Sequence, residues 1–238
     1  YALDVFCQCV NERIAPFLET LIRILIDQLQ KGDKKVQELA IGNIANVAKA
    51  AQKLFLPFYK PVLDLMKQLM ELKTGGDAML NLRARATECV GIIATAVGQQ
   101  AMAPYVDLFM KLAFDGISLK SSTIREMTFT MFGKMAQALD ENFKFYLPTV
   151  MTLILETASA DAPLVHKGQA GTVSIQSIVN DDGDDEFEDI DDEEDEDDVI
   201  EIGNSNMGVR GSFLDEKSAA LLAMGLIAKA TRVHYLPY

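Results

Sequence analysis

The most concentrated chemistry in this sequence is a run of carboxylates. Fifteen of the 18 residues from 181 to 198 are acidic, and no Lys or Arg occurs between 181 and 201. With Glu201 they make up 16 of the chain's 35 acids, which leaves 19 acids against 22 bases elsewhere. The run therefore carries the entire negative balance of the chain. Its acids are Asp181, Asp182, Asp184, Asp185, Glu186, Glu188, Asp189, Asp191, Asp192, Glu193, Glu194, Asp195, Glu196, Asp197 and Asp198.

A run of like charges with few apolar residues has little to offset the entropy lost on folding. We therefore expect residues 161–211 to form a mobile, extended acidic loop. Such a loop would attract a strongly basic partner and raise the rate of encounter with it. This attraction would weaken at high salt. The alternative is a solubilising segment with no partner. A calcium loop is excluded, because Gly183 as the sixth residue of an EF-hand would place Ile178 at its first position.

Residues suited to metal binding or nucleophilic catalysis are few and scattered. The three cysteines are Cys7, Cys9 and Cys89, and the two histidines are His166 and His234. Cys7 and Cys9 are predicted to point to different faces of a helix, which disfavours a shared metal ion. No spacing suggests a Ser/His/Asp or Cys/His arrangement. We therefore expect no enzymatic activity, no metal and no cofactor. Three cysteines that form no disulfide framework indicate a reducing compartment.

Two further classes of partner are disfavoured. The acidic run repels phosphates, and no basic stripe with interleaved aromatic residues suggests direct nucleic-acid binding. No apolar stretch approaches the ~20 residues of a membrane span, and no signal peptide is recognisable. The chain opens as if inside a helix and closes at 236–238, where a further helix should begin. We therefore expect a segment of a longer protein.

The elements that position these residues follow a repeat. Pro16, Pro61, Pro104 and Pro148 are separated by 45, 43 and 44 residues. Repeats of about 40–47 residues built from two helices are typical of HEAT and armadillo solenoids. A second marker, two small residues three apart among large apolar ones, occurs at Ile44–Ala48, Val90–Ala94, Phe132–Ala136 and Met224–Ala228. The sequence predicts an all-α HEAT-repeat solenoid of stacked antiparallel helix pairs, with a long acidic disordered loop.

The period divides the chain into helix pairs and one insertion. We predict a partial HEAT repeat at 1–32, repeats at 33–78, 79–120 and 121–160, the acidic loop at 161–211 and a truncated repeat at 212–238. Helices are expected at about 1–11, 15–30, 34–52, 56–72, 80–98, 101–114, 122–139, 142–158 and 213–232. Residues 160–180 are expected to be irregular, and Ser212 or Asp215 to cap the last helix.

The second helix of each pair carries a charged stripe. Acids recur three positions after the first three prolines, and Arg23 and Lys111 follow two of these acids by four residues. Self-pairing on a solvated face is one interpretation, since an acid four residues before a base stabilises a helix. The functional interpretation places the stripe on the concave, cargo-binding surface of the solenoid. Its acids would be Glu19, Asp27, Asp64, Asp107 and Asp115.

Three stretches resemble a known family. Leu82–Ile93, Tyr146–Pro148 and Glu216–Ala220, which follows the acidic run, are similar to the central HEAT repeats of karyopherin-β (importin-β) nuclear transport receptors. The nearest branch is the importin-4 type, followed by the importin-5 type. The order of these features along the whole chain carries the resemblance, because no single motif in it is diagnostic.

The resemblance implies a monomeric receptor that shuttles between cytoplasm and nucleus. Its partners would be basic cargo such as ribosomal proteins and core histones, the GTPase Ran, which releases cargo when loaded with GTP, and Phe-Gly nucleoporins. The principal Ran site of such receptors lies in earlier repeats than those seen here. A static HEAT scaffold, or a histone chaperone acting through the acidic loop, are the alternatives.

Overall fold

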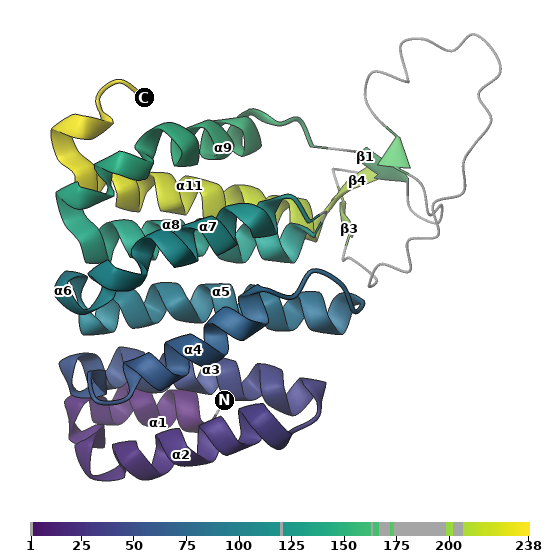
Figure 1. Ribbon diagram of the computed structural model, residues 1–238. Coiled ribbons are helices and arrows are strands. Elements are labelled where there is room, and N and C mark those ends of the chain that lie inside the picture. Colours follow the sequence, from purple (N-terminus) through teal and green to yellow (C-terminus); the bar gives the residue numbers. More distant parts are fainter. Residues whose placement is uncertain (1, 120, 163, 167–171, 174–198, 202–206) are drawn as a thin grey trace, which may run out of the picture.

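Antiparallel helices stacked pair upon pair form two layers (Figure 1). The computed structural model describes residues 2–119, 121–162, 164–166, 172–173, 199–201 and 207–238. In these residues the helical repeat predicted from the sequence is present throughout the stack. The all-α solenoid is therefore confirmed as the fold class.

Each layer takes alternate helices along the chain. The first-helix layer contains α1 (Ala2–Val10), α3 (Lys34–Ala51), α5 (Asp77–Val97), α8 (Ser122–Leu139) and α11 (Gly211–Thr231). The second-helix layer contains α2 (Ala15–Lys31), α4 (Tyr59–Met70), α7 (Val106–Ile117) and α9 (Leu147–Ser159). The connections contain η1 (Asn11–Ile14), η2 (Gln52–Phe55), α6 (Gln99–Met102), η3 (Ala103–Tyr105), η4 (Asp140–Tyr146) and η5 (Arg232–Tyr235), where η marks a 3-10 turn. The predicted helices begin too early at α7 and α9 because these turns precede them.

The small-residue motif brings the first-helix layer into close contact. A Cβ added at Gly91 of α5 would lie 3.0 Å from the Met131 Cα of α8. One added at Gly133 of α8 would lie 2.9 Å from Leu226 Cδ1 and 3.2 Å from the Ala223 Cα of α11. Real Cβ atoms rarely approach neighbours so closely, so only glycine allows these helix backbones to pack at this distance. The close approach expected from the motif is observed at both positions.

The helices of the first layer from α3 onward share one ending. The residue after each helix has a positive φ, and its N–H bonds to the carbonyl four residues back, that of the last Ala in the small-residue motif. The positive φ turns the chain out of the helix, and the N–H bond satisfies one of the terminal carbonyls. The four residues and their φ values are Gln52 (49°), Gly98 (82°), Asp140 (51°) and Arg232 (50°).

The prolines that first marked the period do not occupy one structural position. Pro16 and Pro148 lie at the first two positions of α2 and α9, where a helix has no use for the missing N–H. Pro61 is the third residue of α4. Pro104 lies in η3, before α7 begins. Distance from a proline is therefore an imperfect guide to helix register in this chain.

The described ends of the insertion form a small sheet, which corrects the prediction of an irregular loop. The strands are β1 (Leu164–His166), β2 (Thr172–Val173), β3 (Val199–Glu201) and β4 (Met207–Arg210), in the order β2-β1-β4-β3, with all neighbours antiparallel. Val209 pairs with Leu164 on one side and Ile200 on the other. Strands of only two to four residues carry too little periodic signal to be distinguished from loop.

The start of α11 also differs from the prediction. The helix begins at Gly211, directly after β4, and Arg210 precedes it without a side-chain capping bond. Ser212 and Asp215 therefore lie inside the first turns, and the predicted cap is wrong. By contrast, Asp33 and Ser121 cap α3 and α8, where their side chains accept bonds from backbone N–H groups.

Candidate functional site

The carboxylates of the acidic run, Asp181–Asp198, lie outside the described residues. The described chain on either side of them is held in the one sheet. Chain leaves at β2, which ends at Val173, and returns at β3, which begins at Val199. β2 pairs with β1, and both β1 and β3 pair with β4. β4 leads directly into α11 (Figure 1). The described residues on either side of the run therefore lie beside the N-terminal end of α11.

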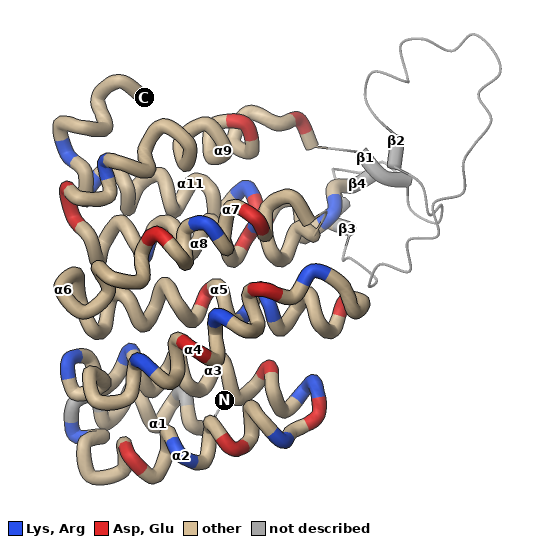
Figure 2. Tube along the Cα trace, viewed as in Figure 1, with Lys and Arg blue, Asp and Glu red and all other residues tan. Residues whose placement is uncertain are grey.

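The five acids predicted for a binding stripe all lie on the second-helix layer. Glu19 and Asp27 are on α2, Asp64 is on α4, and Asp107 and Asp115 are on α7 (Figure 2). All are exposed except Asp115, which is half-buried. The structure thus places them on three successive helices of one layer, as expected. That placement leaves their role in binding a prediction.

The expected pairing along these helices takes a different form. Among the described ion pairs, Lys31 bonds Asp27, and Lys67 Nζ lies 3.8 Å from a carboxylate oxygen of Glu71. Neither Glu19 with Arg23 nor Asp107 with Lys111 is among them. Exposed pairs of this kind stabilise a helix only weakly.

Besides Asp27, two of the five acids have structural partners. The Tyr146 hydroxyl donates a hydrogen bond to Asp107, which ties α7 to the start of α9. Burial, followed by this bond and the charge of Asp107, raises the pKa of Tyr146. The charge of Asp115 acts on Arg83, opposing the effect of burial on that guanidinium. Glu19 and Asp64 remain as the exposed acids with no hydrogen bond or ion pair recorded among the described residues.

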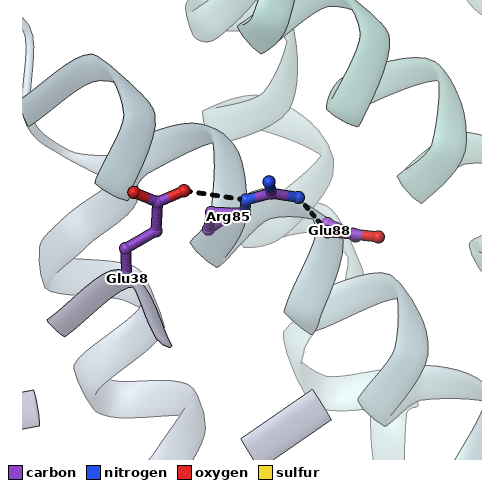
Figure 3. A network of polar contacts seen from close by, with 3 residues as sticks. All are labelled: Glu38, Arg85 and Glu88. Carbon is purple, nitrogen blue, oxygen red and sulfur yellow. Dashed lines mark hydrogen bonds and ion pairs between the residues drawn. The ribbon is translucent and has the colours of Figure 1, made fainter. Parts of the chain in front are cut away.

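A second set of charged side chains, missed by the sequence analysis, lies on the first-helix layer. Arg85 of α5 donates to Glu38 of α3 over 3.2 Å and to Glu88 of α5 over 3.4 Å (Figure 3). Burial lowers the pKa of Arg85, but the bonds and charges of Glu38 and Glu88 outweigh it and the pKa is raised. Arg85 therefore stays charged while it bridges two successive repeats.

Glu126 of α8 lies beside these charged side chains. It is half-buried, and burial together with the charges of Asp215 and Glu88 raises its pKa, although Arg85 acts against this. No hydrogen bond or ion pair of Glu126 is recorded among the described residues. These acids fall at different points of the repeated motif, so the period could not reveal them. A basic group from a partner would relieve the excess negative charge here.

Helix spacing bears on which layer faces a partner. The pairs α3 and α5, α5 and α8, and α8 and α11 are in contact along much of their length, whereas α4 and α7 touch little. In a curved stack, the layer with the closer spacing lies on the inner side. The packing points to the first-helix layer as the side toward which such a stack would bend. The assignment of the concave side to the second-helix layer stays a prediction.

The described residues also bear on metal, membrane and thiol chemistry. They include no group of three His, Cys, Asp or Glu side chains arranged to hold a metal ion. None of the helices that the structure describes combines the length and apolarity of a bilayer span. Cys9 is exposed, whereas Cys7 and Cys89 are buried, and burial raises the pKa of the Cys89 thiol. A thiol in this protonated state is a poor nucleophile.

Comparison with known structures supports the same architecture. Crystal structures of Kap121p bound to Pho4p and to Nup53p superpose over the whole chain, with TM-scores of 0.73 and 0.72 and 20% sequence identity in both. The chain covers 21% of the Kap121p chain in each. At this identity the likeness concerns the fold.

Sequence relatives point the same way. The chain is 25% identical to a probable importin subunit beta-4 of Schizosaccharomyces pombe in an alignment of 241 positions that covers 98% of this chain and 22% of that protein. It is 32% identical to importin-4 of Mus musculus over 206 residues, 85% of this chain and 18% of that protein. The chain thus spans about a fifth of the length of these relatives.

A protein family supplies the most direct assignment. The family described as importin subunit beta-1-like, TPR repeats, matches residues 2–117 and 78–169. Together the two matches cover well over half of the chain. The repeat is longer than the 34 residues of a tetratricopeptide unit and agrees with the length of a HEAT repeat. On these matches the chain belongs to the importin subunit beta-1-like family.

Proposed function

We propose that this chain is part of a nuclear import receptor that binds basic protein segments. The family match over residues 2–169 is the observation that carries the proposal. This family consists of transport receptors, which agrees with the expectation that the chain has no catalytic role. The receptor would act as a monomer, shuttle between cytoplasm and nucleus, and contact Phe-Gly nucleoporins on the way. Kap121p, which shares the fold, has been crystallised with the nucleoporin Nup53p.

Basic cargo such as ribosomal proteins and core histones fits the distribution of charge. The acidic run supplies 15 carboxylates within 18 residues, next to a solenoid that is close to neutral. Long-range attraction of this kind raises association rates and falls with ionic strength. The sheet joins the described residues on either side of the run to the end of α11 that carries Asp215. We propose that the run captures a basic segment and delivers it to the adjacent helices.

We propose that the basic segment of the cargo binds to the carboxylates of the first-helix layer. Glu126 is half-buried and shares its surroundings with Glu88 and Asp215. A lysine or arginine of the cargo would form the ion pair that Glu126 lacks among the described residues. The stripe of Glu19 and Asp64 on the second-helix layer is the competing surface, and single substitutions separate the two.

The acidic run has its own test. Replacing residues 191–198 with Gly and Ser should slow association with a lysine-rich histone-tail peptide and flatten the salt dependence of the rate. An unchanged rate and an unchanged salt slope would show that the run does not attract cargo.

The proposal as a whole is tested with the full-length parent protein. A fluorescent lysine-rich histone tail is titrated with and without Ran locked to GTP. Tight binding that Ran-GTP abolishes is the expected result. Binding that is unchanged by Ran-GTP would overturn the proposal in favour of a static scaffold. If this binding also disappeared when the acidic run was replaced, the protein would be a histone chaperone.

A further inference from the structure

One position in the first-helix layer recurs with a donor side chain. Seven residues before the start of each small-residue motif, at Ile44, Val90, Phe132 and Met224, stands a long side chain that carries N–H groups. These residues are Gln37 in α3, Arg83 in α5, Arg125 in α8 and Lys217 in α11. Each donates a hydrogen bond to another helix or to the residues just beyond its end.

Three of the four donors reach the same feature, the end of the preceding second-layer helix. Gln37 Nε2 donates to the Leu29 carbonyl in the last turn of α2 over 2.8 Å. Lys217 Nζ donates to the Ala160 carbonyl, directly after α9, over 2.8 Å. Arg83 Nη1 donates to the Leu72 carbonyl after α4. The last carbonyls of a helix have no partner within it, so each bond fastens one helix pair to the next.

Arg83 makes a tighter connection than the others. Its Nη2 also donates to the Leu112 carbonyl of α7 over 2.9 Å, so one guanidinium joins α4, α5 and α7. The side chain is only 1% exposed. Gly116 makes room for it, because an added Cβ there would lie 3.2 Å from Nη2. Burial lowers the pKa of Arg83, and the charge of Asp115 opposes this.

Arg125 forms a connection of a different type. Its Nε donates to Glu216 of α11 over 2.7 Å and its Nη2 to the Thr157 hydroxyl of α9 over 3.0 Å. Its side chain is 30% exposed, so water competes for these bonds more than at Arg83. The equivalent position thus varies along the stack in charge, in number of bonds and in burial.

These differences set different resistances to opening. Bonds from an ionised donor are roughly twice as strong as neutral ones, and breaking a buried one leaves an unsatisfied charge. We infer that the residue at this position sets how strongly each helix pair is held to the next, and that this strength differs along the stack. The joint at Arg83 is the stiff one, and the joint at Gln37, between α2 and α3, is the pliant one that opens first when the solenoid changes shape around a partner.

Hydrogen exchange measured by mass spectrometry on the 238-residue chain tests this. In the unaltered chain, amides at the end of α2 should exchange faster than those at the end of α4. Arg83→Gln, which copies the donor at position 37, should speed exchange at the end of α4 and in α7 by about tenfold or more. The amides of α1 and α11 should remain as they were.

Two matched variants complete the test. Arg83→Lys keeps the charge and one bond, so it should give a smaller, equally local increase, and it remains informative if Arg83→Gln does not fold. Gln37→Leu should speed exchange only at the α2–α3 joint, and by less than Arg83→Gln does at its own joint. An increase spread evenly over the chain, or equal effects at both joints, would overturn the inference.

Discussion

The two helix layers share one repeat but differ in how close their helices come. In the first-helix layer, Gly91 and Gly133 allow backbone contact between successive helices. In the second-helix layer, Tyr59 of α4 meets Tyr105 of η3, the residue just before α7, with ring centroids 6.1 Å apart. Close spacing brings charged side chains of neighbouring repeats within reach of one another, as Arg85 and Glu38 show. Wider spacing leaves Glu19 and Asp64 separate, so the packing decides which charges act together.

The largest effect should come from breaking the close spacing itself. Gly91→Val should destabilise the chain by about 1–3 kcal/mol, because the new side chain would press on the backbone at Met131 and on Lys134. Urea unfolding followed by circular dichroism measures the change. Gly42→Ala is the control, since nothing lies within 4 Å of a Cβ there. It should stabilise α3 by up to about 1 kcal/mol. Equal losses at both positions would show that helix contact is not the cause.

The next effect distinguishes the layers by binding. In the full-length parent, Glu126→Gln should weaken the binding of a lysine-rich peptide on the order of tenfold, since it removes a half-buried charge-assisted contact. Asp64→Asn should change it less than twofold, because a charge in water contributes little. Fluorescence anisotropy gives both values. The reverse order would identify the second-helix layer as the cargo surface, as the sequence analysis had expected.

A smaller effect concerns polar groups buried by the close packing. Thr128 of α8 is buried, and its hydroxyl is without a hydrogen-bond partner among the described residues. Thr128→Val keeps the shape and removes that hydroxyl, so it should raise the free energy of unfolding by up to about 1 kcal/mol. Thr87 is equally buried, but its hydroxyl donates to the Arg83 carbonyl over 2.8 Å. Thr87→Val should therefore destabilise by about 1 kcal/mol. A loss at both positions would mean that Thr128 has a partner after all.

The sequence could predict the fold because the residue types that mark the repeat occur in few structural contexts. Glycine and alanine three apart in a helix are explained by close contact, and Gly91 and Gly133 make that contact. The strands β1–β4 escaped prediction because two to four residues carry no periodic pattern.

The candidate site was harder to predict. Counting from prolines assumed one register, but Pro104 lies before α7 while Pro16 and Pro148 lie inside their helices. Glu38, Arg85 and Glu126 come together only through the stacking of three repeats, which a single sequence does not display. The donors at positions 37, 83, 125 and 217 could have been found from the sequence, because each stands seven residues before the small-residue motif.

The smallest effect should appear in the pH dependence of stability. The folded-state pKa of Glu126 is raised, so the native chain holds this proton more tightly than the unfolded chain does. Its contribution to stability is therefore complete below the unfolded pKa of about 4.3 and is lost as the pH rises through the folded pKa. Glu126→Gln should be more stable than the unaltered chain at pH 7, by less than about 1 kcal/mol, and the two should converge near pH 4. Urea unfolding across this range measures the difference. Arg85→Gln removes the cation that, among the described residues, opposes this rise in pKa, so in that background the stability difference between Glu and Gln at position 126 should widen. A stability difference that does not depend on pH would mean that the charge of Glu126 is already balanced by its surroundings. The first-helix layer would then offer no unpaired carboxylate to a basic group.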